Sequence, residues 1–501
     1  MTLSKNLHFT SSFTNELPAD TEMENYTRQV KNAIFSFVKP HIFENPKLII
    51  TSKKILEELK IEDADSTDFL DVFSGKKLLP NMQPYAMAYA GHQFGQWAGQ
   101  LGDGRAINLG ELKGKTNTWQ IQLKGAGATP YSRNGDGFAV LRSSIREFLI
   151  SEAMHHLGIA STRALCLIET GENVLRDKLY NGNPTYEKGA LVCRVSPSFI
   201  RFGNFELLAA RQDLKSLKLL LDYTIKHHYS ELLKIKNEKE RYIEFVRAVS
   251  QNTQKMVVNW MRVGFVHAVM NTDNMSILGE TIDYGPYGWI DNFDRAWTPN
   301  TTDKHERRYR FGNQINVAKW NLMQLANAIF PLINELQSLQ EILDDYQKDV
   351  GIAFYKMQFE KLGLYTKNIE DKLFIDELLN LLESCEMDMT IFYRNLADFT
   401  HYDSFYKKLS DYSYQPNTIE SNKEKWQDWL KQYQNFTENE GLDSAIRKEK
   451  MNAVNPKYVL RNYMVQQAIE QAEKGDYSLI FELHELLKNP YSEQKDKEHW
   501  F

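Results

Sequence analysis

Hydrophobic positions near the start of the chain recur at roughly helical spacing. Within residues 21–40, apolar side chains follow this spacing up to Pro40, which predicts a helix that ends there. Residues 49–59 predict a second short helix. We expect these segments to belong to an N-terminal extension that covers residues 1–84.

From about residue 88 the pattern changes to glycine-rich segments and strict alternation. In residues 105–109, the larger side chains of Arg105, Ile107 and Leu109 alternate with Ala106 and Asn108, which suggests a β-strand. In residues 119–124, every second side chain is apolar, so Lys124 lies on the polar face of a second strand. A turn over residues 113–117 would join the two strands.

Helical periodicity returns after a glycine-rich loop over residues 125–137. Apolar positions at helical spacing predict a helix over residues 141–157, and Gly158 provides its stop. Residues 190–195 predict a further strand, and residues 415–450 are polar and weakly patterned, as in a surface insertion. The later part of the chain predicts mainly helices, over residues 214–225, 242–261, 317–340, 373–382 and 458–474.

These elements predict an α+β protein with a small strand-rich lobe followed by a larger helical lobe. The length of 501 residues fits about three domains, or one large domain with additions. After the N-terminal extension we expect three regions: a strand-rich lobe over 85–206, a helical lobe over 207–415, and a C-terminal helical region over 416–501 packed on the helical lobe.

Composition narrows the class of protein. With 42% hydrophobic and 25% charged residues, the chain resembles an ordinary globular protein, and its net charge of −6 gives no support for a nucleic-acid partner. No apolar run is long enough to span a membrane, and the start has no apolar signal segment, so we expect no membrane partner. Three cysteines cannot build a disulfide framework, and we predict a cytoplasmic protein.

A lysine and a glutamate form the first candidate pair. Lys124 closes a predicted strand, and Glu147 lies on the helix that follows. A strand lysine held by a helix glutamate is how kinase-type folds fix an ammonium beside nucleotide phosphates. On spacing alone, a solvated edge lysine and an unrelated surface acid would give the same sequence.

The second candidate is the stretch HAVMNTDNMSILGETIDYG, which includes Asp273, Asn274 and Asp283. Asn274 and Asp283 offer hard oxygen ligands of the kind that Mg²⁺ takes from proteins, and Asp273 could accept a hydroxyl proton. A short strand over residues 275–278 would place the two ligands at its ends. An asparagine-rich turn followed by an acidic turn is the simpler interpretation, but the order lysine, helix acid, Asp-Asn and Asp-aromatic-Gly is that of kinases.

Arginines and glycine turns complete the candidate chemistry. Arg194 and Arg201 flank a Ser-Pro turn, and a guanidinium group can bind two phosphate oxygens at once. Pairing with Glu206 or with other structural acids is the alternative. The segments Gly102-Asp103-Gly104-Arg105 and Asn134-Gly135-Asp136-Gly137 combine glycines with polar side chains. Backbone amides in such turns bind anions, although glycine pairs are also common in hairpins.

Several long blocks together resemble the selenoprotein O family, also called the YdiU family, of kinase-like protein adenylyltransferases. The blocks extend from about residue 85 to the C-terminal region and include YAGHQFGQWAGQLGDGRAINLGE, QLKGAGATPYSRNGDGFAVLRSSIREFLISEAMHHLGI, CRVSPSFIRFGNFE, MNTDNMSILGETIDYGPYGWID and NPKYVLRNYMVQQAIEQAEKGD. The resemblance implies a protein-kinase-like fold of two lobes that holds ATP in a flipped orientation. It also implies transfer of AMP to protein Ser, Thr or Tyr hydroxyls with release of pyrophosphate.

The resemblance also implies roles for individual residues. Asp273 matches the proton acceptor, Asn274 and Asp283 match ligands of Mg²⁺ or Mn²⁺, and Lys124 with Glu147 matches the ion pair of the phosphate site. The remaining matches are to nucleotide-binding positions: Gly102, Gly104, Arg105, Asp136, Gly137, Arg194 and Arg201, with Lys124 and Asp283.

Other functions stay open at this stage. A kinase that transfers the γ-phosphoryl group, transfer of UMP from UTP with manganese, and a nucleotide-binding pseudoenzyme would use the same parts. One departure from the family is that many relatives carry selenocysteine or cysteine near the C-terminus, whereas this chain ends DKEHWF and its last cysteine is Cys385. The resemblance therefore does not imply a redox switch at such a position, and it leaves the implied catalysis unaffected, because none of the matched site residues is cysteine.

Overall fold

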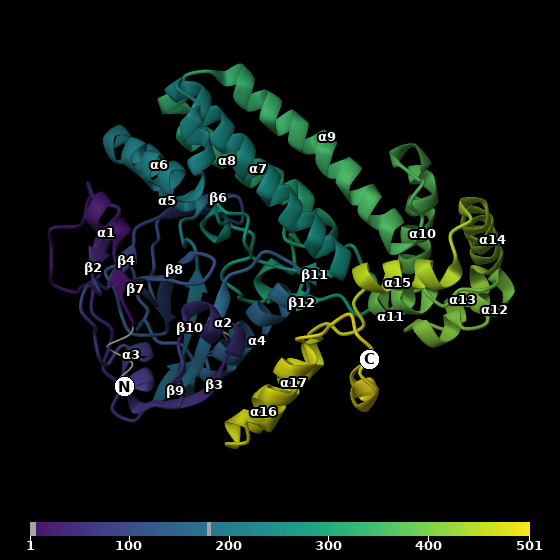
Figure 1. Ribbon diagram of the computed structural model, residues 1–501, viewed down its shortest axis with the longest axis horizontal. Coiled ribbons are helices and arrows are strands. Elements are labelled where there is room, and N and C mark those ends of the chain that lie inside the picture. Colours follow the sequence, from purple (N-terminus) through teal and green to yellow (C-terminus); the bar gives the residue numbers. More distant parts are fainter. Residues whose placement is uncertain (1–6, 178–181) are drawn as a thin grey trace.

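The computed structural model describes residues 7–177 and 182–501. It is a mixed α/β protein with an antiparallel sheet at one end and many helices (Figure 1). Within the described part, the main sheet has eight strands in the order β2-β4-β7-β8-β10-β9-β3, with β1 beside β7. These strands are β1 (Phe9–Thr10), β2 (Phe35–Phe37), β3 (Lys47–Thr51), β4 (Tyr85–Met87), β7 (Ala106–Lys113), β8 (Thr118–Lys124), β9 (Arg163–Arg176) and β10 (Thr185–Ser196).

Two small two-stranded sheets and a series of helices complete the described fold. The pairs are β5 (Ala90–Gln93) with β6 (Gln96–Gln100), and β11 (Phe265–Val266) with β12 (Gly288–Trp289). The α-helices are α1 (Ser12–Glu16), α2 (Lys53–Leu59), α3 (Thr67–Phe73), α4 (Leu141–His156), α5 (Phe202–Ala210), α6 (Leu214–His228), α7 (Glu238–Val263), α8 (Gln314–Ile333), α9 (Leu336–Lys361), α10 (Lys372–Ser384), α11 (Met389–Leu396), α12 (Tyr402–Tyr406), α13 (Asn417–Ser421), α14 (Lys423–Glu440), α15 (Ser444–Val454), α16 (Asn462–Glu473) and α17 (Ser478–Leu486).

The register of the sheet aligns the polar candidates on one face. On β8, Lys124 lies opposite Val192 of β10, and Gln122 lies opposite Arg194. Because directly paired and alternate residues share a face, Gln122, Lys124 and Arg194 all point to the same side of the sheet. The alternation seen in the sequence of β8 therefore places the candidate lysine beside a candidate arginine from another strand.

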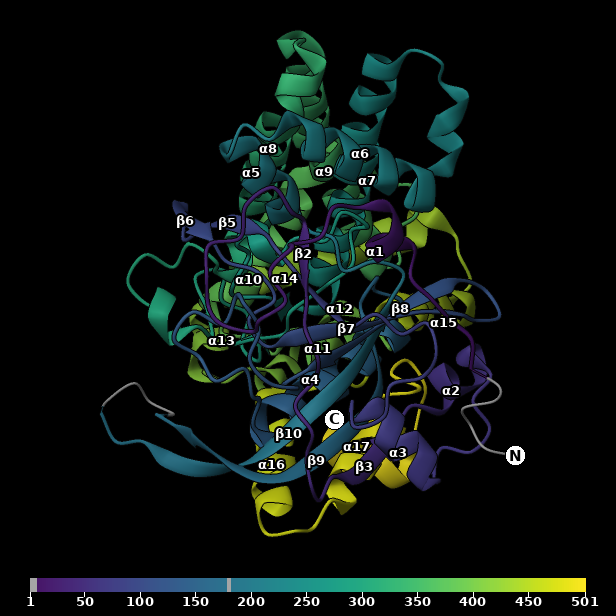
Figure 2. The ribbon, with the colours of Figure 1, turned by 90° about the vertical axis from the view of Figure 1, so that its left-hand side faces the viewer.

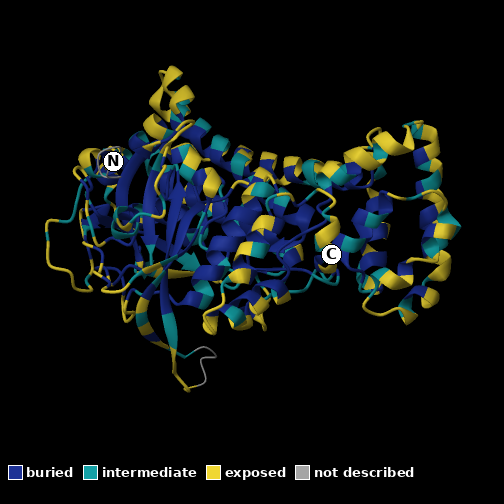
Figure 3. Ribbon diagram, turned by 60° about the horizontal axis from the view of Figure 1, so that its bottom comes forward, coloured by how far each residue is buried: buried dark blue, intermediate teal, exposed yellow. Residues whose placement is uncertain are grey.

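The two faces of the sheet are covered by different helices. On the face that carries Lys124, α4 packs against β9 and β10, and the last helices, α16 and α17, return to pack against α4. The other face contributes apolar side chains such as Ile121 and Leu123 to a second core with α2 and α3. Figure 3 shows buried residues concentrated along the sheet and the central helices.

The strand-rich region confirms most of the local predictions. The strands predicted over 119–124 and 190–195 lie within β8 and β10, and the one predicted over 105–109 overlaps β7 from Ala106. The loop over 125–137 contains no helix or strand, and α4 ends just before Gly158, whose φ is +74°. The helices predicted over 214–225, 242–261, 373–382 and 458–474 correspond to α6, α7, α10 and α16.

Four local predictions are wrong. Residues 21–40 form no helix: the backbone at Asn32 is left-handed, with φ of 57°, and the aromatic residues that follow pair as β2. The single helix predicted over 317–340 is two helices, α8 and α9, separated at Asn334, whose φ is 52°. Residues 275–278 form no strand, because the chain there makes single bridges and turns.

The fourth concerns residues 415–450, which are not a weakly structured insertion. They form α13, α14 and most of α15. Trp426 and Trp429 of α14 are fully buried, and Trp429 stacks on Phe374 of α10 with ring centroids 4.7 Å apart. The buried side chains of α14 include large aromatic rings, and these few residues pack the helix into the core although the segment is polar overall. Among the described helices, none is both long and apolar enough to cross a bilayer.

Candidate active site

One cavity of about 820 Å³ gathers nearly all the predicted site residues. It lies between the sheet and the segments that follow α7, and Glu147 lines an adjoining cavity of about 830 Å³. Residues Arg105 and Lys124 line both cavities. The predicted residues in the first cavity are Gly102, Gly104, Arg105, Lys124, Asp136, Gly137, Arg194, Arg201, Asp273, Asn274 and Asp283.

Lys124 and Glu147 form a buried ion pair. The Lys124 Nζ atom lies 2.6 Å from Glu147 Oε2, and the glutamate is 3% exposed. The pair forms because Lys124 ends β8 on the face covered by α4. Burial lowers the pKa of the Lys124 ammonium, whereas the carboxylates of Glu147 and Asp283 raise it. Neither side chain is the solvated surface group of the alternative interpretation.

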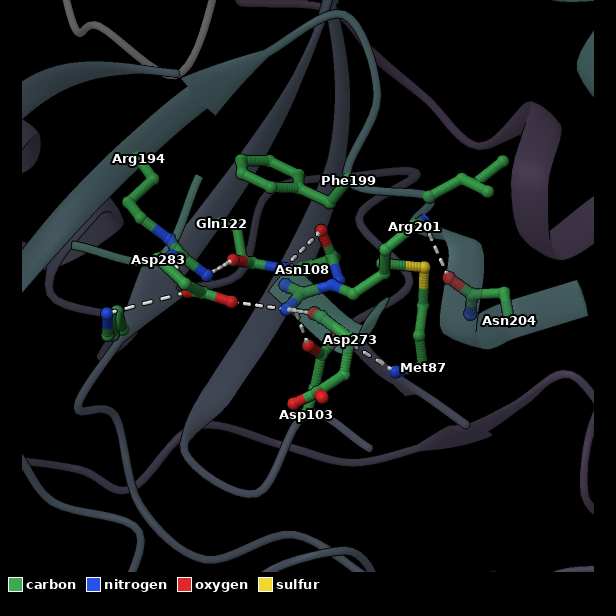
Figure 4. Close-up of polar contacts among 12 residues, drawn as sticks. Met87, Asp103, Asn108, Gln122, Arg194, Phe199, Arg201, Asn204, Asp273 and Asp283 are labelled. Atoms are coloured by element: carbon green, nitrogen blue, oxygen red, sulfur yellow. Dashed lines mark hydrogen bonds and ion pairs between the residues drawn. The ribbon is translucent and has the colours of Figure 1, made fainter. Parts of the chain in front are cut away.

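Three cations converge on the carboxylate of Asp283 (Figure 4). Arg194 Nη1 lies 2.5 Å from Oδ1, Arg201 binds Oδ2, and Lys124 Nζ lies 3.5 Å from Oδ1. Burial raises the pKa of this carboxyl group, but Arg201, Arg194 and Lys124 outweigh it and hold the pKa well below its usual range. Asp283 therefore stays ionised.

The two arginines are fixed by several further contacts. Arg194 also donates to Glu147 Oε1 at 3.1 Å and to the side chain of Gln122. Arg201 donates to the backbone carbonyl of Asp273 at 2.8 Å. Both guanidinium groups are at most 2% exposed, so they are pre-organised to bind anions within the cavity.

Glu206 does not pair with these arginines. Its Oε1 atom instead lies 2.6 Å from Nδ1 of His92, on β5. Pairing with Glu206 is therefore wrong, whereas pairing with other acids is found: Arg194 binds Glu147 and Asp283, and Arg201 binds Asp283. Both arginines line the cavity.

Asp273 presents one oxygen without a partner. Its side chain is 7% exposed, Gln93 Nε2 donates to Oδ2 at 3.2 Å, and no hydrogen-bond partner for Oδ1 lies within the described residues. Burial raises the pKa of this carboxyl group to about 6, although Gln93 and Arg201 act to lower it. A carboxylate with this pKa can accept a proton near neutral pH.

Strand β5 approaches Asp273 closely through a glycine. A Cβ atom on Gly91 would lie 2.7 Å from Asp273 Oδ1. Only a residue without a side chain fits this approach, which brings the β5–β6 hairpin directly beside the carboxylate.

Asn274 and Asp283 are the two residues that could hold a metal ion. Asn274 Nδ2 donates to the carbonyl of Val269 at 2.9 Å, which leaves its carbonyl oxygen for a ligand. Among the described residues no group of three or more His, Cys, Asp or Glu side chains is arranged as a metal site. The two oxygen donors of Asn274 and Asp283 suit Mg²⁺, because Mg²⁺ in phosphate-binding sites takes few oxygens from the protein and the rest from the phosphates.

His267 connects the two segments that carry these residues. Its Nε2–H donates to the carbonyl of Ile282 at 2.8 Å, next to Asp283, and its ring stacks on Trp260. Burial lowers the pKa of the imidazole, so the ring is neutral and its role is to position the Asp283 segment.

The glycine turns form one wall of the cavity. Gly102 has φ of +105°, and a Cβ atom there would lie 2.5 Å from the Tyr131 ring. Gly137 has φ of +76°, and a Cβ atom there would lie 2.1 Å from the backbone of Gly127. The turns therefore need glycine for close packing, and they expose backbone to the cavity.

Asp136 lies beside these turns and is already paired. Arg176 donates to both of its carboxylate oxygens at 2.8 Å, and both residues line the cavity. Burial acts to raise the pKa of the Asp136 carboxyl group, but Arg176 outweighs burial and holds the pKa below its usual value. A nucleotide that contacts Asp136 would therefore contact a carboxylate whose charge is balanced by Arg176.

Sequence reasoning gave no role to three residues of the site. Gln93 contacts Asp273 from a hairpin that nothing in the local pattern marks as functional. Gln122 accepts a hydrogen bond from Arg194. Its position on the same strand face as Lys124 is the sequence feature that could have indicated a place in the site. Asp103 is 2% exposed, and one of its carboxylate oxygens lies 3.7 Å from Arg201 Nη2. Its position between two glycines is the sequence feature that could have indicated a place in the site.

Comparison with known proteins agrees with this geometry. A family model described as protein adenylyltransferase SelO matches residues 19–488. Relatives named protein nucleotidyltransferase YdiU are 54% identical in Flavobacterium johnsoniae, 49% in Rhodopirellula baltica and 51% in Azoarcus sp.. The alignments cover 98–99% of this chain and 95–96% of each relative. A cavity lined by glycines, buried cations and carboxylates, together with these matches along nearly the whole chain, identifies the protein as a member of the SelO family of protein adenylyltransferases, also called the YdiU family.

Proposed function

We propose that this enzyme transfers AMP from ATP to Ser, Thr or Tyr hydroxyl groups of proteins, with ATP flipped relative to its orientation in kinases. The acceptor oxygen forms a bond to the α-phosphorus, the bond between the α- and β-phosphates breaks, and pyrophosphate leaves. Asp273 takes the hydroxyl proton through its unpaired oxygen. The cations that now bind Asp283 hold the leaving pyrophosphate.

A single observation carries this proposal. Lys124, Arg194 and Arg201 converge on one carboxylate in the cavity, and Arg201 also contacts the backbone of Asp273. Three cations exceed the one lysine that an ordinary kinase uses for its phosphates. Charge that develops on departing pyrophosphate would be stabilised by these pre-organised donors, which is electrostatic catalysis.

The site residues are suited to a divalent cation. Asn274 and Asp283 would hold Mg²⁺ or Mn²⁺, and the bound ion would neutralise charge on the phosphates. Because the oxygens of Asp283 are bound by Arg194 and Arg201, we expect the nucleotide phosphates to take over these arginines when Asp283 becomes a metal ligand. Gly102, Gly104, Arg105, Asp136 and Gly137 would contact the rest of the nucleotide.

We propose the same arrangement of lobes that the sequence predicts. Strands β4 to β10 with α4 would form the small lobe of a kinase-like fold over residues 85–206, and β1, β2 and β3 of the N-terminal extension would complete its main sheet. Helices α6 to α12 would lie in the large lobe over 207–415, with α5 across the boundary. The proposal retains an N-terminal extension over residues 1–84 and a C-terminal helical region over residues 416–501. A cytoplasmic location is also proposed, supported by three buried cysteines that form no disulfide in the structure.

Labelled nucleotides test this function. Purified enzyme would be incubated with Mg²⁺ and ATP labelled at either the α- or the γ-phosphate, followed by gel analysis and mass spectrometry of the products. We expect label from the α position and an added mass of one AMP on Ser, Thr or Tyr. Label from the γ position alone would establish the kinase alternative, and preferential use of UTP with Mn²⁺ would establish UMP transfer.

A further inference from the structure

Two exposed aromatic side chains lie on the hairpin that contacts Asp273 through Gln93. Phe94 and Trp97, on the β5–β6 hairpin, are 42% and 45% exposed. The tip of the hairpin is a two-residue turn with left-handed backbone at Phe94 and Gly95, as in type I′ turns. Gln93, directly before this tip, donates to Asp273. Figure 2 shows the hairpin standing apart from the main sheet.

A turn over residues 303–310 is attached to the same hairpin. The buried carboxylate of Asp303 accepts hydrogen bonds from the backbone N–H groups of Arg308 and Tyr309, at 3.0 and 2.8 Å. The Tyr309 hydroxyl accepts from the N–H of Phe94 at 2.8 Å and donates to Asn271 Oδ1 at 2.5 Å. The turn is therefore fixed both to the hairpin and to the segment that carries Asp273.

This turn carries a local excess of positive charge. It contributes four cationic side chains against one exposed acid, Glu306, in a chain whose net charge is −6. Arg308 lies over the ring of Trp320 at 4.7 Å and against Gly95, so it is continuous with the hairpin. Within the described residues, no acidic side chain forms an ion pair with any of the four cations, which are Lys304, Arg307, Arg308 and Arg310.

We propose that the hairpin and this turn together form the docking surface for the acceptor segment of the protein substrate, and that this segment is acidic near its hydroxyl residue. We call this docking surface the hairpin–turn surface; it is made by Phe94, Trp97, Lys304, Arg307 and Arg308. Uncompensated cations attract carboxylates and disfavour basic segments, and exposed aromatic rings hold the apolar parts of a peptide. This inference rests on the proposed function, because it describes what presents the hydroxyl to Asp273.

Matched peptides test the charge preference. Three peptides would share one serine acceptor and differ only in flanking residues, which are Glu and Asp, Gln and Asn, or Lys. With wild-type enzyme and α-labelled ATP, we expect kcat/KM for the acidic peptide to exceed that for the neutral peptide by about tenfold. The difference should shrink strongly at about 0.5 M salt, where exposed charges are screened.

A charge-reversal variant tests which cations are responsible. Lys304→Glu with Arg307→Glu changes two exposed side chains that make no side-chain hydrogen bond in the described structure. This variant should lose the preference for the acidic peptide and favour the basic one, with an unchanged KM for ATP. A control with the same charge change, Lys236→Glu with Lys239→Glu at the start of α7, should behave as wild type.

Binding provides a readout that does not depend on turnover. The same peptides with alanine in place of serine would be titrated by fluorescence anisotropy in the presence of a non-hydrolysable ATP analogue. Equal affinity of wild type for the acidic and neutral peptides would overturn the docking proposal, as would a change in KM for ATP in the Lys304→Glu, Arg307→Glu variant. The proposed function fails separately, if α-label enters neither a peptide nor the enzyme itself.

Discussion

Replacing Glu147 with glutamine should separate the organisation of the phosphate site from general stability. Glu147 contacts two cations, Lys124 at 2.6 Å and Arg194 at 3.1 Å, and all three side chains are largely buried. Glu147→Gln keeps the size of the side chain and removes its charge. The ammonium of Lys124 then loses the contact that most opposes the effect of burial on its pKa.

The expected magnitudes follow from these contacts. Removing one partner of a buried ion pair costs about 3–5 kcal/mol, and we expect about 3 kcal/mol because Asp283 still faces both cations. Catalysis should suffer more specifically, since Lys124 and Arg194 would no longer be fixed beside the phosphates. We expect kcat/KM for AMP transfer to fall by about a hundredfold, a typical loss for one pre-organised electrostatic contact.

A second buried ion pair on the same helix supplies the control. Glu152 of α4 accepts from Arg163 at 2.8 and 2.7 Å, and neither residue lines the nucleotide cavity. Burial raises the pKa of Glu152, but Arg163 and Ser52 lower it to about 2, in place of 4.5. That difference corresponds to about 3 kcal/mol of stability, present above pH 4.5 and lost as the pH falls through about 2.

The assay compares Glu147→Gln and Glu152→Gln with wild type. Thermal unfolding gives the loss of stability, and α-labelled ATP gives the transfer rate per folded molecule at a temperature where all three proteins are folded. Both variants should be destabilised to a similar degree, and only Glu147→Gln should lose activity. The reasoning is refuted if Glu147→Gln keeps the wild-type rate, or if Glu152→Gln loses as much activity.

Four further predictions follow from the site. Asp283→Ala should abolish AMP transfer by removing a metal ligand, and self-labelling equal to wild type would contradict this. EDTA should stop transfer by the wild-type enzyme, with recovery on adding Mg²⁺ or Mn²⁺; activity that persists in EDTA would contradict the metal ligands. Because Asp273 must be ionised to accept a proton, the wild-type rate should fall as the pH drops through about 6, whereas Asp273→Asn should bind ATP, transfer at least a hundredfold more slowly and lose this dependence. Gly203→Ala would place a Cβ atom 2.1 Å from the Ala90 carbonyl oxygen, so it should lower stability by at least about 1–3 kcal/mol in thermal unfolding; an unchanged midpoint would argue against this contact.

Local periodicity explains how much of the site could be predicted from the sequence. Strand β8 alternates strictly, so its pattern places Lys124 on the face opposite Ile121 and Leu123, which pack in the core with α2 and α3. Helix α4 has apolar residues at helical spacing and a glycine stop, so its pattern places Glu147 on a helix that follows the strand. The order of these parts along the chain then indicates a nucleotide site.

Contacts between distant segments account for what could not be predicted. Gln93 and Asp273 are 180 residues apart, and only the folded chain brings the β5–β6 hairpin to the carboxylate. The N-terminal apolar residues have helical spacing, yet a left-handed residue at Asn32 and pairing with β4 hold them in extended structure. Tertiary contacts override local preference in both cases.

The orientation of bound ATP is the central claim, and a crystal structure of the complex with a non-hydrolysable ATP analogue and Mg²⁺ tests it most directly. The account predicts that Lys124, Arg194 and Arg201 contact the β- and γ-phosphates, and that the α-phosphorus lies nearest to the Asp273 carboxylate. A complex in which the γ-phosphorus lies nearest to Asp273 would contradict it.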